Sequence, residues 1–136
     1  MKSPLARYLD EGTMSPLDLH DAVLAGLPTQ EVVRFMSSFN SIPRSQLLAA
    51  LKLNESALQR LKDARLTAAA SGAALDLGRV LRSAIDVLGS KEEAERWLSA
   101  PAIAFRGQRP LDLLATRQGT QLLFDHLVCM EYGVYV

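Results

Sequence analysis

The chain is poor in the residue types that usually carry catalysis or bind metals. Its 136 residues include one cysteine and two histidines, and it contains no G-x-G-x-x-G run, phosphate loop or C-x-x-C pair. The single Cys129 excludes an intramolecular disulfide framework and is typical of a reducing compartment. Catalysis needs a nucleophile with a base, paired carboxylates or a metal cluster, and no such set is recognisable. We therefore predict a protein that is not an enzyme and uses no cofactor, and a small enzyme is the least favoured class.

The two histidines do not form the beginnings of a metal site. His126 and Cys129 are three residues apart on a predicted helix, but zinc sites need three or four ligands. Asp125 projects from a different side of that helix. A packed histidine beside a buried cysteine explains the pair better, and His20 with Asp21 is best explained as a surface pair. We predict no metal.

Charge and hydropathy provide no strong attraction to a membrane or to nucleic acid. No apolar run approaches the roughly 18 residues of a membrane span, and the N-terminus lacks the apolar core of a secretory signal. We therefore expect a cytoplasmic protein with no membrane partner. The 15 basic and 15 acidic residues cancel, but five basic residues oppose two acidic ones between Arg44 and Arg65. Residues 1–34 carry a net charge of −2. Any contact with nucleic acid is expected in the middle of the chain.

Apolar residues recur at helical spacing, and no stretch alternates as a β-hairpin would. Gly26 with Pro28 is predicted to end a short helix, and Thr29 to cap the next one. Gly89 is predicted to end a longer apolar helix. The alanine-rich residues 66–72 are interpreted as a hinge or a junction between helices. The sequence predicts an all-α fold.

Residues 43–64 have the periodicity of a helix-turn-helix. Leucines give the first helix an apolar face, Lys52 lies in the turn, and Asn54 is a suitable N-cap for the second helix. Polar side chains remain on the outer side of that second helix, where a reader of the major groove needs them. The DNA-facing candidates are Ser56, Gln59, Arg60 and Lys62. The same pattern also fits two packing helices with no DNA role.

The last third of the chain combines a helix, a turn-rich connector and an apolar end. Trp97 is expected in the core, and residues 101–110 form the connector. Thr116 is predicted to cap a last helix, whose apolar stripe includes Leu122. Chain ends are usually polar unless they are tied down, so Tyr132–Val136 is expected to be buried in the core or in a partner. For the final two residues we favour the partner.

This stretch resembles the toxin-binding domain of the Xre/MbcA/ParS antitoxin family. The resemblance covers roughly residues 75–136, and residues 43–64 resemble the helix-turn-helix of that family. The residues that carry it are Gly89, Ala94, Trp97, Leu98, Pro101, Gly107, Pro110–Leu114, Thr116, Gly119 and Tyr132–Val134. The chain departs from the family pattern at Ala102, where relatives tend to have Asn, and at Phe105–Arg106, where a small or aliphatic pair is commoner.

Residues 1–15 have few periodic apolar positions and are predicted to be a partly ordered segment. The resemblance implies that a helix-turn-helix bundle, 16–70, and a helical toxin-binding domain, 71–136, follow it. It implies a type II antitoxin that sterically blocks the active site of an NAD-using, ADP-ribosyltransferase-like toxin of the RES or ParT type. It also implies that the protein binds its operator DNA as a homodimer and represses its own operon. The implied toxin-binding residues are Arg106, Gly107, Arg109, Pro110, Leu111, Asp112, Leu114, Tyr132, Gly133, Val134, Tyr135 and Val136. A transcription regulator whose C-terminal half only dimerises, and a helical adaptor without a DNA role, remain alternatives.

Overall fold

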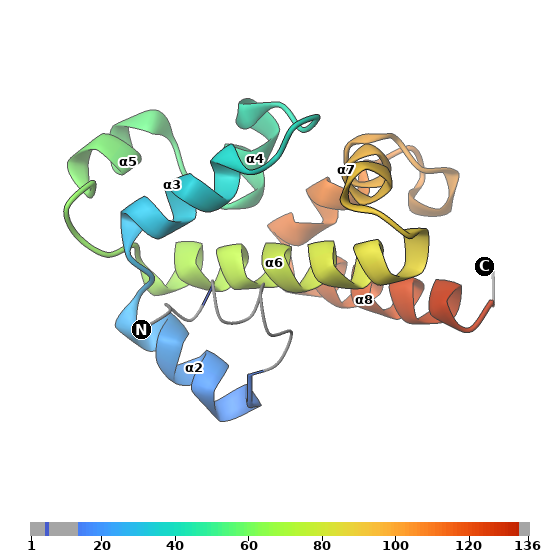
Figure 1. The fold of residues 1–136 in the computed structure, drawn as a ribbon, viewed down its shortest axis with the longest axis horizontal. Helices are drawn as coiled ribbons and strands as arrows, with labels where there is room; N and C mark the ends of the chain where they lie inside the picture. The colour runs from blue at the N-terminus through green and yellow to red at the C-terminus, as the bar shows by residue number, and fades with distance from the viewer. Residues whose placement is uncertain (1–4, 6–13, 134–136) are drawn as a thin grey trace.

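The computed structural model describes Leu5 and residues 14–133, and every regular element in these residues is helical (Figure 1). This confirms the all-α prediction, while the predicted lead-in 1–15 lies almost wholly outside the described residues. The elements are α2 (Pro16–Ala25), α3 (Thr29–Ser37), α4 (Arg44–Ala50), α5 (Glu55–Arg60), α6 (Ala68–Leu88), α7 (Lys91–Ser99), the 3-10 helices η1 (Ile103–Phe105) and η2 (Pro110–Ala115), and α8 (Arg117–Glu131). None of the helices in the described part is long and apolar enough to cross a membrane.

Helix α6 is the longest element and runs through the middle of the molecule (Figure 1). It packs against α2, α7 and α8. Thr67 caps its start by accepting a hydrogen bond from the backbone N–H of Ala70, and Gly89 ends it in the left-handed conformation at φ 97°. Residues 66–72 were interpreted as a hinge or a junction between helices. A hinge is wrong, because α6 begins at Ala68 and continues unbroken, and only Leu66 and Thr67 precede that helix. Alanine is the strongest helix former, so this stretch extends the helix.

Side-chain caps fix the starts of five described helices. Each cap accepts a hydrogen bond from a backbone N–H three residues later, which satisfies one of the unpaired donors of the first turn. The capping residues are Ser15, Asn54, Thr67, Ser90 and Thr116. The predicted caps at Asn54 and Thr116 are confirmed. The predicted cap at Thr29 is wrong, because Thr29 is the first residue of α3 and Pro28 occupies the capping position.

The chain after α5 returns to the connector between α2 and α3. The backbone N–H of Leu66 donates to the carbonyl of Leu27 at 2.9 Å, and that of Thr29 donates to Ala64 at 3.1 Å. Gly26 has a φ of 84° and lies close to the backbone of Leu66. A Cβ atom at this position would come within 2.4 Å of the Leu66 carbonyl oxygen. Buried Ser71 of α6 accepts a hydrogen bond from the Leu27 N–H at 2.8 Å. These contacts fasten the helix-turn-helix region to the start of α6.

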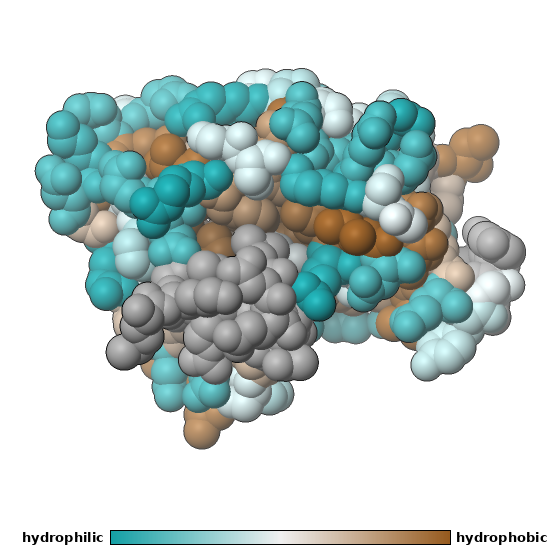
Figure 2. All heavy atoms as spheres, viewed as in Figure 1, coloured by the Kyte–Doolittle hydropathy of each residue, from teal (hydrophilic) through white to brown (hydrophobic). Residues whose placement is uncertain are grey.

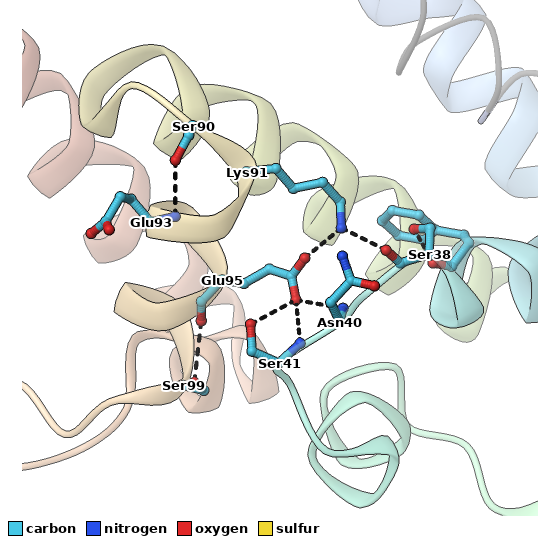
Figure 3. Close-up of polar contacts among 9 residues, drawn as sticks. Ser38, Asn40, Ser41, Ser90, Lys91, Glu93, Glu95 and Ser99 are labelled. Carbon is cyan, nitrogen blue, oxygen red and sulfur yellow. Dashed lines mark hydrogen bonds and ion pairs between the residues drawn. The ribbon is translucent and has the colours of Figure 1, made fainter.

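A buried carboxylate fastens the loop between α3 and α4 to α7 (Figure 3). The Glu95 side chain is 1% exposed, and its Oε1 accepts hydrogen bonds from the backbone N–H groups of Asn40 and Ser41, both at 2.8 Å. Its Oε2 forms an ion pair with Lys91, whose ammonium group also donates to the Ser38 carbonyl at 2.6 Å. These five residues therefore join two segments that are 53 to 55 residues apart in the sequence. The predicted boundary between residues 70 and 71 falls inside α6 and stays a prediction.

Candidate functional site

His126 takes part in aromatic packing that holds three elements together. Its ring stacks on Trp97 of α7 with centroids 6.2 Å apart, and it meets the edge of Phe105 at 4.8 Å. Cys129, one turn further along α8, is half-buried and is a free thiol. No group of three or more potential metal ligands gathers among the described residues. The histidine therefore positions the connector against α7 and α8.

The connector between α7 and η2 is closed by its own backbone hydrogen bonds. The N–H of Ala102 donates to the carbonyl of Gln108 at 3.1 Å, and the Ala102 carbonyl accepts from Phe105 at 3.1 Å and from Gly107 at 2.9 Å. Phe105 is buried beneath this loop, whereas Ile103 is 99% exposed. Figure 2 shows hydrophobic atoms protruding at the end of the molecule where this connector lies.

The two connector arginines differ in their environment. Arg109 forms a two-pronged ion pair with Asp112, through Nε to Oδ2 at 2.9 Å and Nη2 to Oδ1 at 3.1 Å. This hydrogen bonding raises the pKa of Arg109. The Arg106 side chain is exposed and makes no hydrogen bond or ion pair with the described residues, and its backbone has a positive φ of 58°. Gly107 follows at φ 82°. The connector therefore exposes one uncompensated positive charge.

The other predicted toxin-binding residues divide by burial. Pro110, Leu111 and Leu114 are buried in η2, which packs against α4, α7 and α8, so they support the surface from below. Tyr132 is 76% exposed and Gly133 is also exposed, at the end of α8. Val134, Tyr135 and Val136 lie outside the described residues. The structure thus brings the connector residues together and leaves the role of the final residues as a prediction.

Two apolar side chains of this region were missed as surface residues. Ile103 of the connector is almost fully exposed, and Leu122 of α8 is 51% exposed, as is Val128 on the same helix. The placement of Leu122 in the core-facing stripe is therefore wrong, because the buried residues of α8 are Leu123 and Leu127. Leu123 and Leu127 are four residues apart and lie on the same face of α8, whereas Leu122 lies about 100° to one side of that face. An apolar stripe can be this wide, so the sequence alone does not show that Leu122 is exposed, nor which of Ile103 and Phe105 is buried.

Leu122 also lines a hollow next to the connector. The hollow has a volume of about 310 Å³ and includes Phe105, Arg106 and Leu113 in its wall. A shallow apolar recess with one cation beside it suits a contact with another protein better than a reaction, since the recess contains no acid–base pair.

The predicted DNA-facing residues all lie at the surface near α5. Ser56, Gln59 and Arg60 are exposed on α5, and Lys62 is exposed in the turn that follows the helix. An exposed ion pair joins the starts of α4 and α5, with Arg44 Nε 2.6 Å from Glu55 Oε1. The hydrogen bond from Arg44 lowers the pKa of Glu55.

The turn between α4 and α5 is tight. Lys52 adopts a positive φ of 59° there, and Asn54 caps α5 immediately afterwards. The two short helices and this turn have the order that was predicted for residues 43–64. Contact of α5 with DNA stays a prediction.

Comparison with known proteins agrees with this arrangement. Residues 83–133 match the family described as the antitoxin Xre/MbcA/ParS C-terminal toxin-binding domain. The matched segment contains α7, the connector, η2 and α8. A protein of Pseudomonas putida named Antitoxin Xre is 26% identical over 121 residues, which cover 88% of this chain and 74% of that relative. Residues 83–133 are therefore similar to the toxin-binding domain of the Xre/MbcA/ParS antitoxins, and most of the chain is similar to a protein named Antitoxin Xre.

Proposed function

We propose that this antitoxin inhibits an NAD-using toxin by covering its active site with the connector and the exposed side of α8. The observation that supports the proposal is the exposure of Ile103, Leu122 and Tyr132 within or at the edge of the segment that matches a toxin-binding domain. Exposed apolar groups that lie in one functional region mark sites of protein association. Aromatic residues and arginine are enriched at such interfaces, and Tyr132 and Arg106 fit that composition.

Inhibition would be steric. The family resemblance implies a toxin similar to ADP-ribosyltransferases, with NAD as the substrate of the toxin. A stable protein interface buries roughly 800 Å² on each partner. The connector alone is too small for this, so the outer side of α8 would contribute most of the remaining area. Such a cover would prevent NAD from entering the cleft of the toxin without any reaction on the antitoxin.

The test is NAD consumption by the product of the adjacent reading frame, measured with and without the purified antitoxin. We expect NAD to disappear and the antitoxin to stop its loss. A Leu24→Ala antitoxin should inhibit as well as the wild type, because Leu24 is an exposed leucine of α2, outside the matched segment. If the product binds the antitoxin and leaves NAD intact, the partner modifies a different target. If it neither binds nor reacts, inhibition is the wrong function.

Repression of its own operon is a second proposed role. The local excess of basic residues between Arg44 and Arg65, together with the four exposed polar side chains around α5, favours contact with operator DNA. Arg60→Ala and Lys62→Ala should each weaken binding and reduce the salt dependence by about one phosphate contact. If binding to operator DNA occurs and neither change weakens it, α5 is not the DNA-facing element.

A C-terminal truncation distinguishes the inhibitor function from its main alternative, a transcription regulator. An inhibitor that lacks residues 132–136 should lose affinity for the toxin. A regulator whose C-terminal half only dimerises should keep its toxin-independent operator binding after a truncation that leaves the dimer intact. Sedimentation of the free protein tests the homodimer at the same time.

A further inference from the structure

Ile103 stands on a backbone that is already fixed in the free protein. Isoleucine is among the residue types most often buried, yet this side chain is 99% exposed. An isolated exposed apolar residue needs no explanation by itself. Here, however, the backbone hydrogen bonds from Ala102, Phe105 and Gly107 close the loop on both sides of Ile103. The loop holds an apolar side chain away from the protein rather than letting it fold back.

The loop is also anchored from below. Phe105, two residues after Ile103, is 5% exposed, and its ring meets His126 of α8 edge-on at 4.8 Å. The same histidine stacks on Trp97 of α7. The connector is therefore fastened to two helices by the residue that points inward, while Ile103 projects outward.

The backbone next to Ile103 has an unfavourable conformation for its residue type. Arg106 has a φ of 58°, a region that L-residues other than Gly, Asn and Asp rarely adopt, and its N–H donates to the Ile103 carbonyl at 3.0 Å. Non-glycine residues in this conformation cluster at binding and switch sites, where the surroundings hold them in place. Glycine would fit here without strain, but an arginine occupies the position.

The charges around Ile103 indicate the chemistry of its partner. Asp112 neutralises Arg109, whereas Arg106 has no partner among the described residues. Ile103 is therefore three residues from an arginine whose charge is not neutralised by any of the described residues. A complementary surface has an apolar pocket for the side chain and a carboxylate at the rim of the pocket.

We propose that Ile103 is the central anchor of the toxin interface and inserts into an apolar pocket of the toxin, where Arg106 pairs with a carboxylate at the rim. This proposal rests on the proposed function, which makes the toxin the partner of this face. Because the loop is already ordered, binding requires little further ordering of the connector. The contribution of Ile103 then appears mainly in the rate of dissociation.

The test compares toxin affinity and dissociation rate for the full-length wild type, Ile103→Ala, Ile103→Asp and the control Leu24→Ala. Residues at the centre of an interface cost about 2 kcal/mol or more when truncated, so Ile103→Ala should weaken binding roughly thirtyfold. Ile103→Asp should weaken it further, and Leu24→Ala should match the wild type. The Tm of all variants should equal that of the wild type, since the Ile103 side chain makes almost no contact within the chain.

Arg106→Gln tests the second half of the proposal. It should accelerate dissociation and make the affinity less dependent on salt, because the ion pair is lost. Inhibition by the wild type together with unchanged affinity of Ile103→Ala would overturn the anchor and leave the proposed function standing. Changed sedimentation of Ile103→Ala with unchanged toxin affinity would assign the side chain to self-association and also overturn it. A lowered Tm would show that Ile103 packs within the chain and would equally reject the proposal.

Discussion

At the scale of single residues, Glu95 is the polar side chain with the largest expected effect on stability. It is 1% exposed and accepts hydrogen bonds from Asn40 and Ser41 while it pairs with Lys91. Its removal leaves two part-buried N–H groups without their acceptor and an ammonium group without its ion-pair partner. We expect Glu95→Ala to lower the free energy of unfolding by about 3 kcal/mol.

Urea denaturation measures this loss, with Glu92→Ala as the control on the same helix. Glu92 is an exposed residue whose carboxylate lies 3.5 Å from Arg96, and exposed pairs contribute little. The midpoint of Glu92→Ala should lie close to that of the wild type. Equal midpoints for both variants would mean that the buried carboxylate does not hold α7 to the loop between α3 and α4.

The same carboxylate predicts a pH dependence. Burial acts to raise the pKa of Glu95, but the hydrogen bonds from Lys91, Ser41 and Asn40 outweigh it, and the net pKa is lowered. A carboxyl group with a lowered pKa in the folded state stabilises the fold above its unfolded value of about 4.3. This stabilisation is lost as the pH falls through the folded pKa.

The measurement is the urea midpoint of the wild type and of Glu95→Gln between pH 7 and pH 3. The difference between the two should be constant near neutral pH and shrink as the pH falls below about 4. The pKa of Glu55 is lowered and that of Asp76 is raised, so these groups also make stability depend on pH. Both groups are present in the wild type and in Glu95→Gln, so their effects cancel in the difference. Parallel curves over the whole range would contradict the assignment.

At the scale of elements, the junction between α2 and α3 depends on a glycine that nothing else can replace. A Cβ at Gly26 would come within 2.4 Å of the Leu66 carbonyl oxygen, and φ is 84°. Gly89, which ends α6, has a φ of 97° but nothing within 4 Å of its Cβ position. Gly89→Ala should cost about 1 kcal/mol, because only the left-handed conformation is penalised. Gly26→Ala should cost at least twice as much in urea denaturation, and equal losses would exclude the close contact as the cause.

The elements show where sequence reasoning succeeds and where it stops. Local signals sufficed for Asn54, Thr116 and Gly89, because a cap or a helix end is set by residues within one turn. The alanine-rich residues 66–72 left a hinge and a junction between helices as alternatives, since the helical pattern there is hydrophobic only through small residues. The resemblance of residues 75–136 to a toxin-binding domain agrees with the family match over residues 83–133.

Contacts between distant segments could not be predicted in this way. Glu95 lies 55 residues from Asn40, and in the sequence it is one of three glutamates between positions 92 and 95. Its neighbours Glu92 and Glu93 pair with Arg96 at the surface. Only the three-dimensional packing of α7 decides which of the three is buried. The exposure of Ile103 likewise follows from the closure of the connector, which depends on the packing of Phe105 against His126.

At the scale of the whole molecule, side-chain packing and hydrogen bonds join the N-terminal half to the matched toxin-binding segment. Helix η2 packs against α4, Glu95 holds the loop after α3, and α6 begins before the predicted boundary at residues 70 and 71. The hydrophobic core is one cluster that extends from the N-terminal helices to α8. A domain that folds alone needs its own core and few contacts across its boundary. We therefore expect the matched segment to depend on the N-terminal half for its stability.

The corresponding prediction concerns a fragment of residues 71–136. It lacks α4, the loop that satisfies Glu95, and α2, which packs against α6. We expect the fragment to unfold without a cooperative transition by circular dichroism and to bind the toxin at least tenfold more weakly than the full chain, because only a minor fraction is folded. The full chain should unfold in one transition, and Glu95→Ala should lower the Tm of both halves together. A fragment with a cooperative melt and full affinity would show instead that the toxin-binding half is an independent domain, and that the joint at Glu95 only orients it.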